Sequence, residues 1–523
     1  MLAALLVLGI AACGNDSETG SKKPKPPKNE SSVSDTSSDN SSEDGTSSDT
    51  PSEDSASSGS DGVSSGSDDG YDYTVSRDPY ESDEETAREH FNDTDGDFDY
   101  KTVKWAGPSG YTIVVPNGDT HAREAAEYLQ DYYVRVHNVT LNIVTDTAKA
   151  SDKEILIGKT NRSESNRSLS ESELEVALKG NKLVFSGGHY VTTEAAVKRF
   201  TRLMPDKNEA FTFKLKTDFS STVDFLDDYE YVWGDEFEDW YDIDFGKWNF
   251  RLGMAGNTVM ETSTDRDVID VSDGRLKLTP CYVFDPSNKD LEFKVPWSVA
   301  TDATMNYVYG YAEIRARVPF YDGIWPSFWG GTGCDLKAPR NPNWHAEIDV
   351  FENFGTTDSL RPNIHKWYDT NLLNELFGLD PDERAHFQYP KRNTYTFANP
   401  ENLSNEYHIY GYEWTPTEMN IYIDGEKYMT FDIVNSFDAN PDMSMFQDPQ
   451  YNQFNCHVYS NGDSNPPSLI YDNLDLLPAA YYIDYFRLYQ KKPGSVDYES
   501  ELYTDTSKRG QEPNNRKKAI TLD

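Results

Sequence analysis

Short apolar and aromatic runs, separated by Gly, Asn, Asp and Pro, fill the chain from about residue 224 to residue 490. This pattern is typical of antiparallel strands joined by turns, and it predicts an all-β sandwich. Residues 311–318 alternate cleanly, with the apolar side chains on one predicted face and Glu313 and Arg315 on the other. Further strands are expected at 418–424, which leads into a tight turn, and at 481–489.

Residues 101–222 have a different pattern, in which strand-like runs alternate with helical ones. A helix capped by Asp119 or Thr120 would place apolar side chains on one face at intervals of three or four, namely Ala125, Leu129, Tyr132 and Val136. Strands are expected at 111–115, 141–144, 154–158 and 182–185, and a second helix at 193–203. The alternation predicts a small α/β layer domain.

Gly187-Gly188-His189 lies between the last of these strands and the second helix. We interpret it as a turn that requires glycine rather than as a phosphate-binding loop. Through IVVPNG, AAEYLQDY and EILIGKTNR, this region resembles the accessory α/β domains that precede the catalytic domains of some bacterial glycoside hydrolases.

The apolar run at residues 2–12 is too short to span a bilayer. It ends in Ile-Ala-Ala-Cys13 and resembles a bacterial lipoprotein signal. In that interpretation residues 1–13 contain the signal peptide, which is cleaved before Cys13, and the Cys13 thiol is then lipidated. An ordinary secretory leader is the alternative. Residues 14–100 predict a disordered linker, because residues 14–70 are mostly Ser, Asp, Gly, Glu and Thr and offer almost no apolar surface to bury; residues 71–100 are transitional and still acidic. Residues 491–523 form a polar tail.

The chain of 523 residues carries a net charge of −42, which argues against nucleic acid as a partner. Besides Cys13 it contains Cys281, Cys334 and Cys456, whose spacing does not suggest a metal site. We expect free buried thiols or at most one disulfide.

The stretch Trp344–Gly355 contains the candidate chemistry. On a strand, Glu347 and Asp349 share one face, whereas Glu352, five residues after Glu347, would point the other way. A one-residue β-bulge near Phe351 would bring all three carboxylates to the same surface, and bulges are common beside active sites.

Three acids on one sheet face are unfavourable for stability and useful for controlling protonation. They suit a retaining glycosidase, with Glu347 as nucleophile, Glu352 as acid/base and Asp349 hydrogen-bonded to Glu347. The alternatives are an acidic strand edge facing solvent or a calcium site.

These residues resemble the E-x-D-x-x-E signature of glycoside hydrolase family 16, whose members have a concanavalin-like β-jelly-roll fold. The resemblance extends over residues 230–490 and includes WGDEF at 233–237, YGYAEIRAR at 309–317, GIWPSFW at 323–329 and YIDYFRLY at 482–489. It implies a multidomain protein whose jelly-roll catalytic domain, at 224–490, follows the α/β domain and the linker.

The resemblance also implies further site residues. Substrate-binding positions would be Glu313, Arg315, Trp329, Trp344 and His365. The alternatives are a surface ion pair for Glu313 and Arg315, a place in the core for the two tryptophans, and a structural hydrogen bond for His365. A structural Ca²⁺ away from the cleft would be bound by Glu236, the Gly274 carbonyl and Asp484. No cofactor is expected for catalysis.

The leading hypothesis is an endo-acting β-glycanase, with β-1,3-glucan as substrate, at the extracellular face of a bacterial membrane as a lipid-anchored monomer, or secreted. A galactan hydrolase of the agarase, porphyranase or carrageenase type, a transglycosylase, and a non-catalytic carbohydrate-binding protein are the alternatives. Sulfated galactans would require cationic groups in the cleft, for which Arg251, Arg315, Arg361 and Lys366 are candidates.

Overall fold

The computed structural model describes residues 74–75, 100–204, 211–216 and 221–505, the last range with gaps at 240–242, 252–259, 265–267, 273, 285–290, 303, 333–343, 354–358, 369–385, 390–394, 397–403, 405, 436–441, 459–476, 478 and 495–497. The predicted signal at residues 1–13, Cys13, nearly all of the predicted linker and Cys334 lie outside this range. Within it, no helix is both long and apolar enough to cross a membrane.

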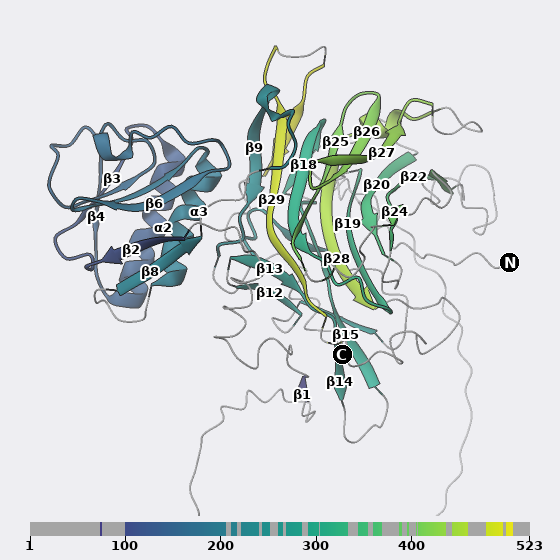
Figure 1. Ribbon diagram of the computed structural model, residues 1–523, viewed down its shortest axis with the longest axis horizontal. Coiled ribbons are helices and arrows are strands. Elements are labelled where there is room, and N and C mark those ends of the chain that lie inside the picture. Colours follow the sequence, from purple (N-terminus) through teal and green to yellow (C-terminus); the bar gives the residue numbers. More distant parts are fainter. Residues whose placement is uncertain are drawn as a thin grey trace, which may run out of the picture. The chain divides into compact units, whose positions relative to one another are not determined.

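Two antiparallel sheets, visible side by side in Figure 1, form the sandwich. The first, here called the site sheet, runs in the order β10 (Asn249–Arg251), β16 (Ser298–Ala300), β28 (Gln450–Val458), β19 (Ile324–Thr332), β20 (Trp344–Glu352), β22 (Asn363–Tyr368) and β23 (His386–Tyr389), with β17 (Met305–Val308) beside β28 and β30 (Glu501–Thr504) beside β17. The second, the back sheet, runs β12 (Ile269–Ser272), β13 (Arg275–Leu278), β29 (Tyr481–Lys491), β18 (Gly310–Arg317), β25 (His408–Trp414), β26 (Glu418–Ile423) and β27 (Glu426–Asp432), with β9 (Tyr229–Asp235) beside β29.

One hydrophobic core fills the space between the two sheets. It includes Phe328 and Ile348 from the site sheet and Ile314 and Phe486 from the back sheet, all fully buried. Because strand side chains alternate, the polar residues of both sheets face outward, on opposite sides of the sandwich. The predicted all-β sandwich is confirmed.

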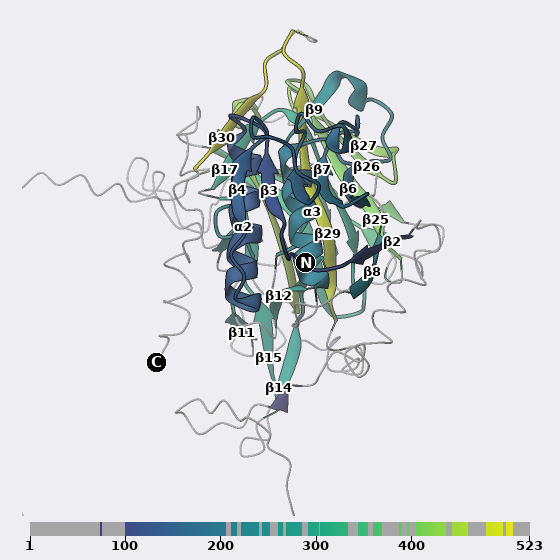
Figure 2. The same ribbon diagram turned by 90° about the vertical axis from the view of Figure 1, so that its left-hand side faces the viewer.

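The α/β unit contains a five-stranded sheet in the order β4 (Asn142–Thr145), β3 (Thr112–Val115), β5 (Glu154–Ile157), β7 (Lys182–Gly187) and β6 (Leu174–Lys179). Helices α2 (Thr120–His137) and α3 (Tyr190–Leu203) contact each other and this sheet, as Figure 2 shows. Smaller sheets pair β2 (Tyr100–Trp105) with β8 (Phe211–Lys216), β21 (Ser359–Leu360) with β24 (Tyr395–Thr396), and β1 (Thr74–Val75), β14 (Cys281–Phe284), β15 (Leu291–Pro296) and β11 (Met260–Ser263) in that order.

The turn before α3 requires glycine, as predicted. A Cβ on Gly188 would lie 1.8 Å from the Ser170 carbonyl oxygen, so no other residue fits without moving the backbone. The helix begins at Tyr190, earlier than predicted, because the His189 side chain caps it. In α2, Asp119 is the N-cap as expected, but Val136 is 41% exposed rather than buried.

Two other expectations need correction. The predicted polar tail contributes β30, which pairs with β17 and extends the site sheet. The predicted linker contributes β1, which pairs with β14. Both segments are short, and their pairing depends on the distant strand that receives them. Cys281 and Cys456 are buried free thiols, in agreement with prediction.

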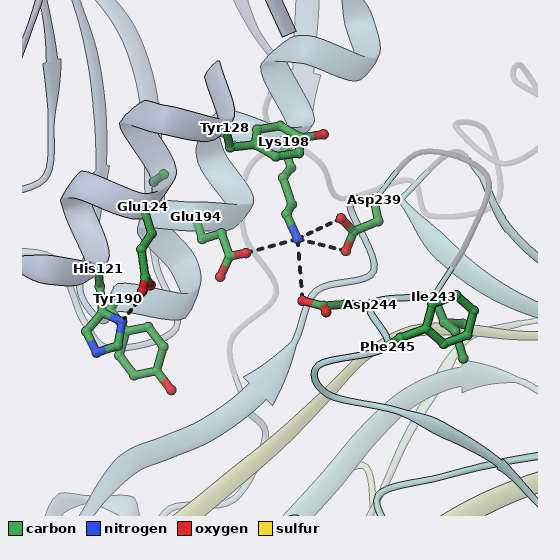
Figure 3. A pocket seen from close by; sticks show the side chains of 11 residues that line it. His121, Glu124, Tyr128, Tyr190, Glu194, Lys198, Asp239, Ile243, Asp244 and Phe245 are labelled. Carbon is green, nitrogen blue, oxygen red and sulfur yellow. Dashed lines mark hydrogen bonds and ion pairs between the residues drawn. The ribbon is translucent and has the colours of Figure 1, made fainter. Parts of the chain in front are cut away.

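The α/β unit contacts the sandwich through α3. Glu238, which follows β9, accepts bonds from Arg199 and Arg202 at 2.6 and 2.7 Å. Next to it, the Lys198 ammonium lies 2.7 Å from Asp239 and 3.0 Å from Glu194, and a cavity of about 360 Å³ opens beside this cluster (Figure 3). The start of α3 also packs on the outward aromatic side chains of the back sheet, including Tyr231 and Tyr489.

Candidate active site

A bulge in β20 brings the three acids to one surface. In the pairing with β19, Phe328 lies opposite Phe351 and Trp329 opposite Asp349, so Val350 has no partner. The pairing register on the other side of β20 also shifts by one residue. Glu347 pairs with His365 of β22, whereas Glu352 exchanges backbone hydrogen bonds with Arg361, which precedes β22. The predicted bulge is therefore confirmed, with Val350 rather than Phe351 as the extra residue.

The side chains on either side of the bulge follow this geometry. Val350 and Phe351, although adjacent, are both buried in the hydrophobic core. Two consecutive residues on one face are the signature of a bulge, and the next residue then returns to the opposite face. Glu352 accordingly shares an electrostatic environment with Asp349 and His365 on the outward face of the site sheet.

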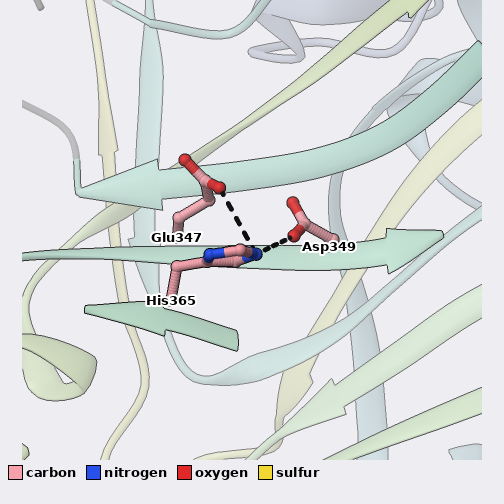
Figure 4. Close-up of side chains that lie close together, drawn as sticks. All are labelled: Glu347, Asp349 and His365. Carbon is pink, nitrogen blue, oxygen red and sulfur yellow. Dashed lines mark ion pairs between the residues drawn. The ribbon is translucent and has the colours of Figure 1, made fainter. Parts of the chain in front are cut away.

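His365 lies between two of the acids, as Figure 4 shows. Its Nε2 atom is 2.8 Å from Asp349 Oδ2 and 3.7 Å from Glu347 Oε1. The predicted bond between Asp349 and Glu347 stays a prediction, and the structure adds an imidazole nitrogen that lies near both carboxylates. Among the described residues, these three form a group whose ligand atoms lie within 4.8 Å of one another. His365 Nε2 therefore lies within ion-pair distance of both acids when the imidazole is protonated.

Burial controls the protonation of the acids. It raises the pKa of Glu347 to about 8, with Asp349 and Glu352 adding to the rise and His365 opposing it. Burial also raises the pKa of Asp349 and of Glu352 well above their ordinary values, and the Asp349 charge adds to the rise for Glu352. The raised pKa of Glu352 suits a proton donor, which must hold its proton near neutral pH.

The structure brings some of the predicted substrate-binding residues to this face. Trp329 lies on β19 opposite Asp349, and its indole donates to Asn455 at 2.5 Å. His365 faces the acids. Trp344 begins β20, but its side chain lies outside the described part of the chain.

Glu313 and Arg315 do not belong to this face, which corrects the sequence-based assignment. They project from β18 on the outward side of the back sheet, across the hydrophobic core from Glu347. There Glu313 is fully buried and accepts from Ser221 at 2.6 Å and from Tyr485 at 3.2 Å, while Arg315 pairs with Asp484 at 2.9 Å. The alternation of their strand was predicted correctly, but alternation does not show which outward face forms the site.

The proposed calcium ligands lie near the back sheet. Glu236 receives two bonds from Arg487, at 2.8 and 2.9 Å, and Asp484 is paired with Arg315. Gly274 has the positive φ of 72° that glycine favours, and a Cβ there would lie 3.1 Å from Glu238. The calcium site stays a prediction. An ion bound there would compete with Arg487 for Glu236 and with Arg315 for Asp484.

Sequence reasoning missed Trp367. Its indole Nε1 donates to Glu347 Oε2 at 3.1 Å, and its ring lies parallel to that of His365, with centroids 5.8 Å apart. The signal that could have found it is its spacing of two from His365, which puts both side chains on one strand face.

Comparisons with known proteins find similarity to glycoside hydrolases in the sandwich. Residues 275–462 match the model of glycosyl hydrolases family 16. The chain is 25% identical over 290 residues to a glucan endo-1,3-beta-glucosidase A1 of Niallia circulans, covering 50% of this chain and 38% of that protein. It is 28% identical over 217 residues to a glucan endo-1,3-beta-glucosidase of Cryptopygus antarcticus, covering 39% of this chain and 70% of that protein.

Among solved structures, the X-ray structure of the laminarinase from Rhodothermus marinus aligns at 24% identity with a TM-score of 0.37, over 50% of this chain and 98% of that one. The part of the chain that matches the Niallia circulans relative covers little more than a third of that protein's length.

Proposed function

We propose that the protein is an endo-acting, retaining glycoside hydrolase that cleaves a β-linked polysaccharide, with β-1,3-glucan as the substrate. The observation that carries the proposal is the bulge at Val350, because it puts Glu347, Asp349 and Glu352 on one face with His365 between the first two. The family 16 match over residues 275–462 supports the reaction class. Two relatives named glucan endo-1,3-beta-glucosidase support the choice of polymer.

In the proposed reaction, Glu347 attacks the anomeric carbon as a carboxylate and forms a covalent glycosyl-enzyme. Glu352 gives its proton to the departing glycosidic oxygen in that step. It then removes a proton from the water that hydrolyses the intermediate, which restores both carboxyl groups to their starting states. His365 and Asp349 hold Glu347 in place and bias its ionisation.

Attack requires the ionised form of Glu347, which burial disfavours. The pKa of about 8 already includes the hydrogen bond from Trp367, so substrate binding must favour the carboxylate at neutral pH. A raised pKa at Glu352 favours the reaction, because a proton donor has to remain protonated until the bond breaks.

We also propose that the enzyme acts outside the cell, tethered through a lipid on Cys13. The basis is the apolar run at residues 2–12 and the polar stretch that follows it. The predicted linker at residues 14–100 would suit a substrate too large to enter a cell.

The test is incubation of the purified protein with laminarin, lichenan, agarose, porphyran and carrageenan, followed by analysis of product lengths. We expect oligosaccharides of intermediate length from laminarin, and none from a Glu347→Gln variant that still binds the polymer. Binding without hydrolysis by the parent protein would instead identify a carbohydrate-binding protein. Products from agarose, porphyran or carrageenan alone would replace glucan by galactan as the substrate.

A further inference from the structure

We infer that Trp367 is a positioning residue for the nucleophile, whose indole N–H holds Glu347 Oε2 and leaves Oε1 free to attack. This inference rests on the proposed function of the site.

The strand register fixes the contact. Glu347 on β20 lies directly opposite His365 on β22, and Trp367 follows two residues later on the same face. The indole therefore reaches Glu347 diagonally, with Nε1 3.1 Å from Oε2. On its other side β22 pairs with β23, so the strand that carries both rings is held from both edges.

The two oxygens of Glu347 thus have different neighbours. Oε2 accepts from Trp367, whereas Oε1 lies 3.7 Å from His365 Nε2, beyond hydrogen-bond distance. The rings of Trp367 and His365 are within 6° of parallel, with the indole beside Oε2 and the imidazole beside Oε1. A carboxylate held by one oxygen presents the other in a defined direction, and such orientation lowers the barrier to attack.

The chemistry of indole suits this task. Its N–H is a donor only and does not titrate, so it favours the ionised carboxylate at every pH. The titratable groups that face Glu347 are Asp349 and Glu352 from its own strand, His365 from β22 and Tyr451 from β28. The negative charges of Asp349 and Glu352 favour the protonated form of Glu347. The neutral indole N–H of Trp367 favours the ionised form and does not itself titrate.

The test compares Trp367→Phe with the parent protein on the polymer that the parent hydrolyses. Loss of a hydrogen bond to a charged group should lower kcat at least about tenfold with little change in KM. The acidic limb of the pH profile should move upward by about one pH unit, because Glu347 loses a group that favours its ionised form. A merely structural role for Trp367 would not move that limb.

Two further variants keep the result interpretable. Trp414→Phe removes an indole bond of the same 3.1 Å length, to Phe446 O in the core, and should lower the unfolding midpoint without moving the acidic limb. If Trp367→Phe fails to fold, β-(3-benzothienyl)alanine at position 367 keeps the ring volume and still lacks the donor.

The outcomes separate the two claims. An active parent protein whose variants at position 367 retain kcat and the acidic limb would overturn the role of Trp367 alone. A parent protein that hydrolyses no polysaccharide would overturn the proposed function and this inference with it.

Discussion

The contact between the α/β unit and the sandwich can be tested through Glu238. This carboxylate is 3% exposed and accepts from Arg199 and Arg202, whose side chains are 14% and 19% exposed. Replacing it by Gln keeps the shape, removes the charge and turns an N–H₂ group toward one of the arginines. Breaking a buried ion pair costs about 3–5 kcal/mol, and because the arginines keep some contact with water we expect about 2–3 kcal/mol here.

This loss should lower the unfolding midpoint by about 4–12 °C in differential scanning calorimetry at pH 7. The matched control is Glu127→Gln, which breaks the exposed pair of Glu127 with Arg123 on α2, where both side chains are about half exposed. It should shift the midpoint by less than about 1 °C. Equal midpoints for Glu238→Gln and the parent would refute the reasoning, because the ion pairs would then contribute nothing to holding the unit.

The pH dependence gives a second check on the same variant. Burial alone would raise the pKa of Glu238, but Arg199 and Arg202 outweigh it and lower the pKa below its ordinary value. A lowered folded pKa stabilises the protein above the unfolded pKa of about 4.3, and the benefit disappears as the pH falls through the folded value. The midpoints of parent and Glu238→Gln should therefore differ most near neutral pH and converge in acid.

Two predictions concern the acids of the site. Glu352→Gln should lower kcat on polysaccharide by about 10²–10⁴-fold, because the leaving oxygen loses its proton donor, and much less on an aryl glycoside whose leaving group needs no proton; equal losses on both substrates would exclude this role. Asp349→Asn removes a charge that raises the pKa of Glu347, so the acidic limb of the kcat/KM profile should move to lower pH, opposite to Trp367→Phe; an upward shift would contradict the electrostatics described above.

Much of the site could be predicted because it depends on local parity. The period of two along a strand shows that Glu347 and Asp349 share a face, and the odd spacing to Glu352 demands one extra residue. The same parity separated Glu313 and Arg315 from the core side chains of β18. Each of these inferences needs only neighbours along one strand.

The remainder depends on contacts between distant segments, which the period of a strand does not encode. The position of His365 between two acids follows from the register of β20 against β22. The burial of Glu313 follows from Ser221, a residue 92 positions earlier that covers the back sheet. Likewise, β30 forms because β17 offers it an edge, not because four residues predict a strand.

The central claim is that Glu347 and Glu352 act together from one face, as nucleophile and acid/base, and the configuration of the first product tests it most directly. Proton NMR during the first minutes of hydrolysis, before mutarotation, reports the anomer that is released. Attack by Glu347 followed by water inverts the anomeric carbon twice, so the reducing end should appear first as the β anomer. Initial release of the α anomer would mean a single displacement by water and would contradict a covalent role for Glu347.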